Sequence, residues 1–218
     1  MNRYFVIYKP FGILSQFSGE KDTLKELSDF PKEVYPVGRL DKDSEGLLLL
    51  TDDKALNHYL LNPHFAHSRT YLAQVEGLPD KDALRLLEKG VTINVEGKMY
   101  QTKPALARSL ESAPVLPERN PPIRYRKSVP DSWIKLSLIE GKNRQVRKMT
   151  AAVGFPTLRL VRWSMESLSI EGYEVGEVRE FAEEEIYRLL NINKEKVQKQ
   201  NLTSQRKSFQ RPSVKRRK

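Results

Sequence analysis

The run Gly46-Leu47-Leu48-Leu49-Leu50-Thr51 constrains the fold more than any other segment of this sequence. Its four leucines form the longest purely aliphatic run in the chain, and Asp52 follows the run directly. A run this short, with turn-forming residues at both ends, is typical of a strand that is buried on both faces. It is far below the roughly 20 apolar residues that a membrane-spanning helix requires, so we expect no integral membrane segment.

Hydrophobic periodicity predicts strands and helices that do not alternate regularly. Period-two and β-rich segments predict strands over 4–8, 35–37, 46–51, 70–76, 134–139 and 157–162. Helical spacing predicts helices over 23–27, 80–89, 143–153 and 179–190, and a further helix that ends at about residue 61. Thr51 or Asp52 would cap the helix that ends at 61. Asp80 would cap the helix over 80–89, and Gly90 would end it. This irregular order favours an α+β fold over a doubly wound parallel sheet.

The 218-residue chain carries a net charge of +10, and the excess lies in two separate blocks. Residues 101–163 and residues 194–218 each carry a net charge of +9, whereas the two remaining segments are net acidic. Strong local basic charge is typical of proteins that bind nucleic acid. The second block has few apolar residues and no periodicity, so we expect a folded domain over 1–190 and a disordered basic tail over 191–218. That tail either keeps the protein in solution or binds phosphates as an electrostatic arm.

Metal and thiol chemistry find little support in the sequence. The chain contains no cysteine, which excludes disulfides, thiolate metal sites and thiol nucleophiles, and which fits a cytoplasmic protein. The three histidines, His58, His64 and His67, match no zinc spacing. The acidic loop 38–46 matches only part of a calcium-binding loop, because its twelfth position would be Asp52 and its flanks are not helical. We therefore expect no bound metal.

The same acidic loop, Gly38-Arg39-Leu40-Asp41-Lys42-Asp43-Ser44-Glu45-Gly46, is the first candidate for a functional site. A solvated polar loop is the ordinary interpretation of such a segment. This loop, however, leads directly into the buried leucine strand, which would hold it rigidly. Rigidly held loops are where catalytic side chains are commonly placed.

The second candidate is the basic segment Glu140–Met149. A helix there would place Arg144, Arg147 and Lys148 on one face and Val146 with Met149 on the other. A solvated basic face is again the ordinary interpretation. The surrounding block has little compensating acid, so its charge favours an external anion such as an RNA phosphate.

Taken in chain order, four motifs resemble the RsuA-type ribosomal RNA pseudouridine synthase family. The motifs are Lys9-Pro10-x-Gly12, the loop from Gly38 to Leu48, Arg69-Thr70-Tyr71 and the segment Gly141–Met149. The segments Arg119–Arg124 and Gly154–Leu160 resemble a branch of that family that acts on the large ribosomal subunit. Many relatives have a lysine where this chain has Arg69.

The resemblance implies both a fold and a reaction. It implies a mixed, largely antiparallel sheet with flanking helices and a cleft that binds RNA. It also implies that a uridine in ribosomal RNA is converted to pseudouridine without a cofactor or metal. The uracil base is detached from the ribose, turned, and rejoined to it through a carbon atom. Lys9 is too close to the first residue for an N-terminal S4-type RNA-binding domain to precede it. We expect a monomer whose partner is large-subunit ribosomal RNA.

The resemblance also implies roles for individual residues. Asp41 corresponds to the catalytic carboxylate, which either attacks the ribose or abstracts a ribose proton. Arg144 corresponds to the arginine that pairs with it, and Tyr71 to the tyrosine that stacks on the base and can move a proton. Arg39 would fill the space that the flipped base leaves. The other residues expected to contact RNA or the base are Lys9, Leu40, Lys142, Val146, Arg147, Lys148, Arg124 and Arg126.

Two alternatives stay open on the sequence. The first is a non-catalytic RNA-binding or ribosome-assembly protein with the same fold. The second is a synthase that acts on small-subunit ribosomal RNA or transfer RNA. The presence of Asp41, Tyr71 and Arg144 favours an enzyme, because a carboxylate facing RNA phosphate gives a pure binder no advantage.

Overall fold

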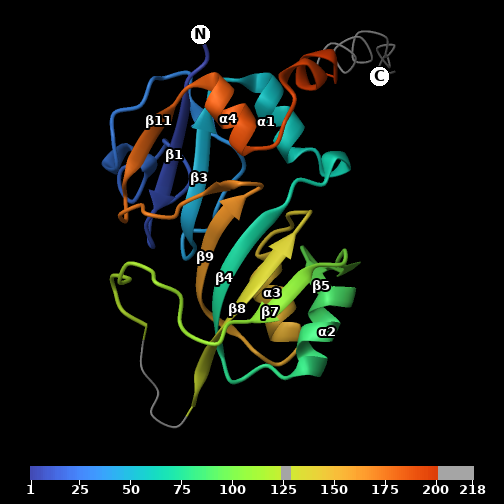
Figure 1. Ribbon diagram of the computed structural model, residues 1–218. Helices are drawn as coiled ribbons and strands as arrows, with labels where there is room; N and C mark the ends of the chain where they lie inside the picture. Colours follow the sequence, from blue (N-terminus) through green and yellow to red (C-terminus); the bar gives the residue numbers. More distant parts are fainter. Residues whose placement is uncertain (124–128, 201–218) are drawn as a thin grey trace, which may run out of the picture.

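The computed structural model describes residues 1–123 and 129–200. These residues form one nine-stranded mixed sheet whose main order is β11-β1-β3-β9-β4-β8-β7, with helices on its faces (Figure 1). All described pairings in this sheet are antiparallel except β3 with β9. This arrangement confirms the predicted α+β fold with a mixed, largely antiparallel sheet.

The elements have the following bounds. The main strands are β1 (Tyr4–Lys9), β3 (Glu45–Thr51), β4 (Arg69–Glu76), β7 (Leu106–Ser109), β8 (Asp131–Leu138), β9 (Thr157–Met165) and β11 (Val178–Phe181). The short strands β2 (Tyr35–Pro36) and β10 (Leu168–Ser169) pair with β3 and β9, and β5 (Thr92–Val95) forms a separate hairpin with β6 (Lys98–Gln101). The helices are α1 (Lys54–Leu61), α2 (Lys81–Lys89), α3 (Gln145–Ala152) and α4 (Glu183–Leu189), with the 3-10 turns η1 (Leu24–Glu26) and η2 (Pro63–Phe65).

The strands β1 and β3 form the buried centre of the N-terminal half. Every residue of both strands is buried, as the leucine run predicts. Residues of α1 and α4 join one face of these strands in the largest hydrophobic cluster, whereas Leu24 of η1 and Val34 cover the other face. Both faces are therefore shielded from water, which explains why the sequence of β3 shows no polar alternation.

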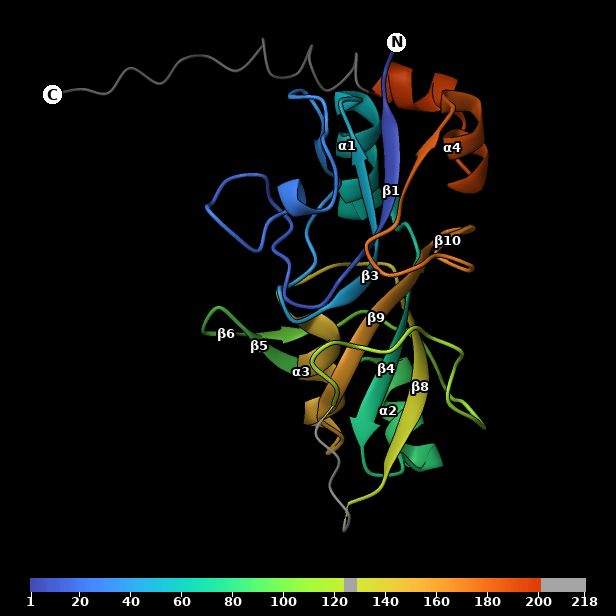
Figure 2. The same ribbon diagram turned by 90° about the vertical axis from the view of Figure 1, so that its left-hand side faces the viewer.

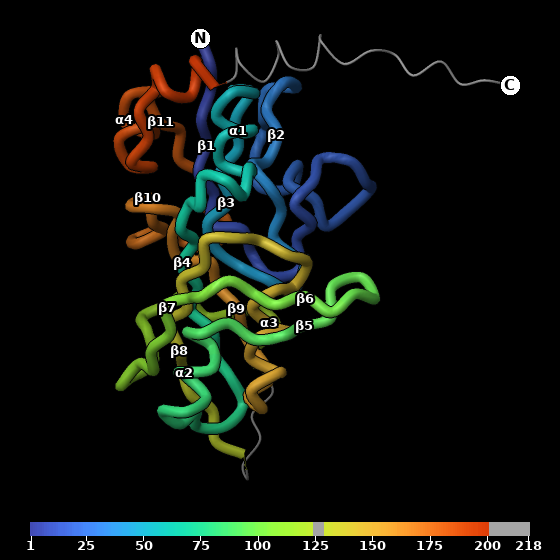
Figure 3. The backbone as a smooth tube through the Cα atoms, turned by 90° about the vertical axis from the view of Figure 1, so that its right-hand side faces the viewer, coloured from blue at the N-terminus to red at the C-terminus, as the bar shows by residue number. Residues whose placement is uncertain are grey.

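The second half of the sheet contains β9, β4, β8 and β7, and its core is a separate hydrophobic cluster. That cluster joins Ala73 and Val75 of β4 to Leu87 of α2 and Met149 of α3. The β5–β6 hairpin and the loop that follows β1 project on the same side of the molecule (Figures 2 and 3). The chain therefore consists of two packed halves that share one sheet.

The two halves meet where β3 pairs with β9 in parallel. The register joins only Glu45 with Val161 and Gly46 with Arg162. Gly46 has a φ of +104°, and a Cβ at this position would lie 2.3 Å from the backbone oxygen of Arg162. Only glycine fits here, because any side chain would collide with β9 and strain the backbone.

Most predicted elements are confirmed, and several boundaries are corrected. Asp80 caps α2 by accepting a hydrogen bond from Ala83 N at 2.8 Å, and Gly90 ends that helix, as predicted. The cap of α1 is Asp53, not Thr51 or Asp52. The predicted helix 179–190 is wrong in its first part, because residues 178–181 form β11 against β1 and the helix begins at Glu183. The pairing partner of β11 is distant in sequence, so local spacing could not reveal it.

The C-terminal segment is more ordered than the sequence predicts. Residues 194–200 are helical, and Ile192 and Val197 pack into the largest hydrophobic cluster. A disordered tail therefore does not begin at residue 191. The remainder of the predicted tail, 201–218, lies outside the described residues.

None of the helices in the described part of the chain has the length and apolar character that a membrane span requires.

Replacing Gly46 with alanine tests the joint between the two halves. We expect Gly46→Ala to lower the melting temperature strongly, because backbone strain of about 1–3 kcal/mol adds to a clash with β9. Gly154→Ala is the matched control, since Gly154 has a similar φ of +93° but nothing within 4 Å of its added Cβ. Equal losses of melting temperature in the two variants would contradict the close approach of the strands.

Candidate active site

A cavity of about 860 Å³ opens between the loop after β1 and the β5–β6 hairpin. Its walls come from segments that are far apart in the sequence. Figure 3 shows two of them, the loop after β1 and the β5–β6 hairpin, which project on the same side of the molecule. The lining includes Phe11–Gly12, Leu14–Gln16, Val37–Ser44, Leu60–Pro63, His67, Arg69, Tyr71, Glu96, Leu138–Val146, Leu160 and Arg162. Parts of both segments that the sequence singles out, residues 38–44 and 140–146, therefore line the cavity.

The backbone of the loop that contains Asp41 is held in place by hydrogen bonds from the segment after β1. The hydroxyl of Ser15 accepts a hydrogen bond from Leu40 N at 3.0 Å and donates one to Leu40 O at 2.9 Å. The backbone N–H of Gly12 donates to Lys42 O at 2.8 Å. These contacts fix both peptide neighbours of Asp41, so its half-buried carboxylate reaches the cavity from a rigid backbone.

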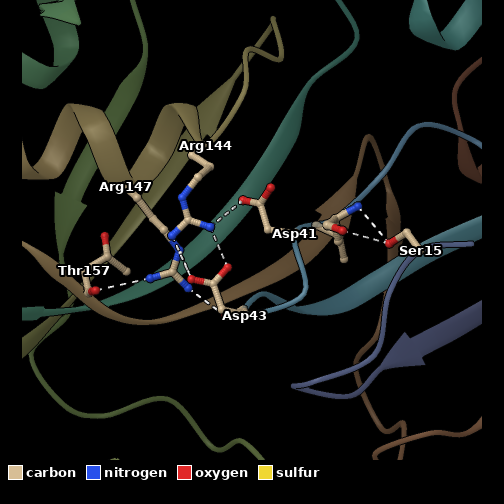
Figure 4. Close-up of polar contacts among 7 residues, drawn as sticks. Ser15, Asp41, Asp43, Arg144, Arg147 and Thr157 are labelled. Atoms are coloured by element: carbon tan, nitrogen blue, oxygen red, sulfur yellow. Dashed lines mark hydrogen bonds and ion pairs between the residues drawn. The ribbon is translucent and has the colours of Figure 1, made fainter. Parts of the chain in front are cut away.

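Arg144 approaches the same loop from the other side of the cavity (Figure 4). It occupies the position before α3 with a φ of +53°, in the left-handed region. Its guanidinium donates to both carboxylate oxygens of Asp43 at 2.8 and 2.7 Å, and it lies 3.6 Å from Asp41 Oδ2. Arg144 therefore does contact Asp41, as expected, but at the longer distance. Its bidentate partner is Asp43.

Arg147 holds Asp43 from a second direction. It donates to Asp43 O at 2.7 Å and to Thr157 O at 3.2 Å, so its side chain ties the acidic loop to β9 (Figure 4). The hydrogen bonds from Arg144, together with the charges of both arginines, hold the pKa of Asp43 below its usual range although burial opposes them. The expected single basic helix face is wrong for these arginines, since Arg144 precedes the helix and Arg147 points inward.

The loop before α3 is held by the buried carboxylate of Glu140. This carboxylate accepts hydrogen bonds from Tyr100 OH at 2.6 Å, Lys103 N at 2.9 Å and Gln145 Nε2 at 2.7 Å. Lys142 Nζ lies 4.6 Å from the centre of the Tyr100 ring. The β5–β6 hairpin therefore positions the segment that carries Arg144.

Tyr71 enters the cavity from β4. Its side chain is half-buried, whereas Ala73 and Val75 farther along the strand are fully buried. Tyr71 pairs with Arg162 of β9, at a point where the register of the two strands shifts. Asp41, Tyr71 and Arg144 thus reach one cavity from three different elements.

The residues expected to bind RNA divide into three groups. Arg39, Leu40, Lys142 and Val146 line the cavity. Lys9, Arg147 and Lys148 do not line it. Arg124 and Arg126 lie outside the described residues.

Lys9 does not face the cavity, because its side chain is 0% exposed. Its ammonium donates to Pro10 O at 2.8 Å and Ile13 O at 2.6 Å, which shapes the turn after β1. Burial lowers the pKa of Lys9 to about 7, against the opposing charges of Glu45, Asp43 and Asp41. A lysine in a Lys-Pro turn looks like a phosphate ligand in sequence, but its carbonyl partners become visible only in the folded chain.

Sequence reasoning assigned no role to three residues that the structure places in or beside the site: Asp43, Glu140 and Arg162. The sequence does contain a signal for Asp43. Its two nearby carboxylates, Asp41 and Asp43, could pair with two nearby arginines, Arg144 and Arg147. Glu140 and Arg162 gave no such signal.

Among the described residues, no group of three His, Cys, Asp or Glu side chains is arranged to hold a metal ion.

Comparisons with known proteins agree on one family. The sequence profile described as RNA pseudouridylate synthase matches residues 3–152. Ribosomal large subunit pseudouridine synthase E of Xanthomonas campestris is 50% identical over 183 residues, covering 80% of this chain and 95% of that protein. The protein of the same name from Vibrio parahaemolyticus is 44% identical over 182 residues, covering 82% and 74%. A crystal structure described as a pseudouridylate synthase is similar with a TM-score of 0.69 and 28% identity, covering 87% and 74%.

The carboxylate of Asp43 makes the site sensitive to acid. Its folded pKa lies below its unfolded value of about 4. Its stabilising effect is therefore complete above that unfolded value and is lost as the pH falls through the folded pKa. We expect Asp43→Asn to be less stable than the wild type at pH 7, and the difference to narrow in acid denaturation below about pH 4.

Asp22→Asn is the control for this measurement, because Asp22 forms an exposed ion pair with Lys42 at 2.8 Å. That pair should matter little and should be screened by salt. A stability difference for Asp43→Asn that stays constant from pH 7 to pH 3 would show that the ionised carboxylate is not the source of the effect.

Proposed function

This chain belongs to the RNA pseudouridylate synthase family, and from that premise we propose that it converts a specific uridine of large-subunit ribosomal RNA to pseudouridine. Two relatives at 50% and 44% identity carry the large ribosomal subunit in their names. The basic block over 101–163 fits a polyanionic substrate of this kind. The enzyme acts as a monomer in the cytoplasm, since the three proposed catalytic residues come from one chain and ribosomal RNA is found there.

The observation that carries the proposal is the meeting of Asp41, Tyr71 and Arg144 in one cavity. Asp41 lies 3.6 Å from Arg144, and Tyr71 reaches the same space from β4. A carboxylate, an aromatic hydroxyl and a cation at one concave site are suited to chemistry on a nucleotide. A protein that only binds RNA has no use for a carboxylate held toward phosphate.

The target uridine has to leave its stack before the cavity can hold it. Leu40 and Val146 are buried apolar side chains in the lining, and they offer a surface on which the uracil packs. Arg39 is exposed at the same lining and can fill the space that the base vacates. Lys142, also in the lining, is placed to meet a phosphate.

Asp41 then acts on the ribose, either by attacking it or by abstracting a proton. Asp43 cannot take this role, because both of its oxygens already accept hydrogen bonds from Arg144. Asp41 has only the longer contact, so its oxygens are free to approach the substrate. Arg144 offsets the negative charge of the two carboxylates where RNA phosphates arrive. The Tyr71 hydroxyl is placed to move a proton at the base.

Asp41→Asn tests the central assignment. We expect it to abolish pseudouridine formation while RNA binding changes little, because the amide keeps the shape but lacks the nucleophilic charge. Conversion of an rRNA transcript and filter binding would be measured together. Asp82→Asn is the matched control, since Asp82 is exposed on α2 and does not belong to the lining. Conversion by Asp41→Asn at the wild-type rate would overturn the assignment.

The substrate is tested by mapping pseudouridines in RNA from cells with and without this protein. A position in large-subunit rRNA that loses its pseudouridine, and regains it with the wild type but not with Asp41→Asn, supports the proposal. Loss of a site in small-subunit rRNA or transfer RNA instead would identify the other substrate class. An unchanged map would favour a non-catalytic RNA-binding protein.

A further inference from the structure

Arg162 is a buried arginine in the cavity lining whose charge is not balanced by a carboxylate. It lies on β9 and is 3% exposed. Its Nε donates to Leu47 O of β3 at 2.7 Å, but its Nη2 has no hydrogen-bond partner among the described residues. No described carboxylate lies within 4.0 Å of its guanidinium. Such a group costs free energy, and unsatisfied buried groups in native proteins are often functional.

Arg159, three residues earlier on the same strand, shows what a structural arginine looks like in this protein. It is also buried, but its Nε and Nη2 donate to the two oxygens of Glu45 at 2.9 and 2.8 Å. Its Nη2 also reaches Pro117 O at 2.9 Å. Arg162 differs from Arg159 in two respects, since it lacks the ion pair and it lines the cavity.

Tyr71 is the favourable neighbour of Arg162. The two residues pair across β4 and β9, beside the register shift between Thr70 and Tyr71. Burial lowers the pKa of the Arg162 guanidinium, Tyr71 acts in the opposite direction, and the charge of Arg69 lowers the pKa further. Tyr71 is half-buried, whereas Arg162 is 3% exposed, although both residues belong to the cavity lining. The burial of the Arg162 guanidinium therefore disfavours its direct contact with an RNA phosphate.

We propose that Arg162 is a positioning residue for Tyr71. Its free Nη2 donates a hydrogen bond to the Tyr71 hydroxyl oxygen when a nucleotide fills the cavity, which turns the hydroxyl proton toward the base. Hydrogen bonds of this kind are often incomplete without substrate and tighten in the complex. The inference rests on the proposed catalytic role of Tyr71 and assigns Arg162 to the same step.

A double-mutant cycle tests the coupling of the two side chains. The substrate is rRNA from cells that lack the protein, and the single-turnover rate constant is measured at saturating enzyme beside RNA affinity. We expect Tyr71→Phe to lower the rate constant by roughly 100-fold, as loss of a proton-transfer group does. Arg162→Gln should lower it about 10-fold or more with affinity nearly unchanged, and should cause no further loss in the Tyr71→Phe background.

Arg159→Gln is the matched control, because it removes a buried guanidinium from the same strand but breaks the pair with Glu45. It should lower the melting temperature, and any effect on rate should be the same in both Tyr71 backgrounds. Arg162→Lys keeps a cation near the hydroxyl and should recover part of the rate. It also replaces Arg162→Gln in the cycle if the glutamine variant does not fold.

The results separate this inference from the function on which it rests. Independent losses that multiply in the double variant would overturn the role of Arg162, as would a loss of affinity at an unchanged rate. A wild-type protein that converts uridines only in another RNA would contradict the proposed substrate, and the cycle would then be judged on that RNA. A fully active Tyr71→Phe would overturn both the role of Tyr71 and its positioning by Arg162.

Discussion

The parallel contact between β3 and β9 joins two halves that are otherwise built from antiparallel strands. Its register is only two residue pairs long, and it depends on the missing side chain of Gly46. The acidic loop enters β3 on one side of this contact, and β4 with Tyr71 pairs on the other side of β9. The cavity lies at the joint because its lining side chains are carried by both halves.

The two neighbouring carboxylates of the acidic loop have different surroundings and therefore different uses. Asp43 is held by Arg144 through two hydrogen bonds and by Arg147 through its backbone oxygen. This arrangement resembles other bidentate arginine–carboxylate pairs, which fix orientation as well as charge. Asp41 has one longer ionic contact, with Arg144, and it lines the cavity. Because Arg144 forms its two hydrogen bonds with Asp43, the carboxylate of Asp41 stays available in the cavity.

The basic charge of the middle block is used partly inside the protein. Arg147 ties a loop to β9, Arg159 is paired with Glu45, and Arg162 is buried opposite Tyr71 in the pairing of β9 with β4. These residues add to the net charge of +9 over 101–163 without presenting their guanidinium groups at the surface. Net charge therefore overstates the number of basic side chains in this block that are exposed to a polyanionic partner.

The sequence by itself determined the features that depend on near neighbours. The periodicity of β1, β3 and β4, the Asp80 cap and the Gly90 end of α2 are local patterns. The ordered motifs identified the family and predicted that Asp41 and Tyr71 belong to one site, and both residues line the same cavity. The tertiary structure alone decided what depends on distant partners. Residues 178–181 form a strand because they pair with the edge of β1. Arg144 forms its hydrogen bonds with Asp43, which is 101 residues away in the sequence. Both outcomes depend on segments that are far apart in the sequence and meet only in the folded chain, so local patterns could not predict them.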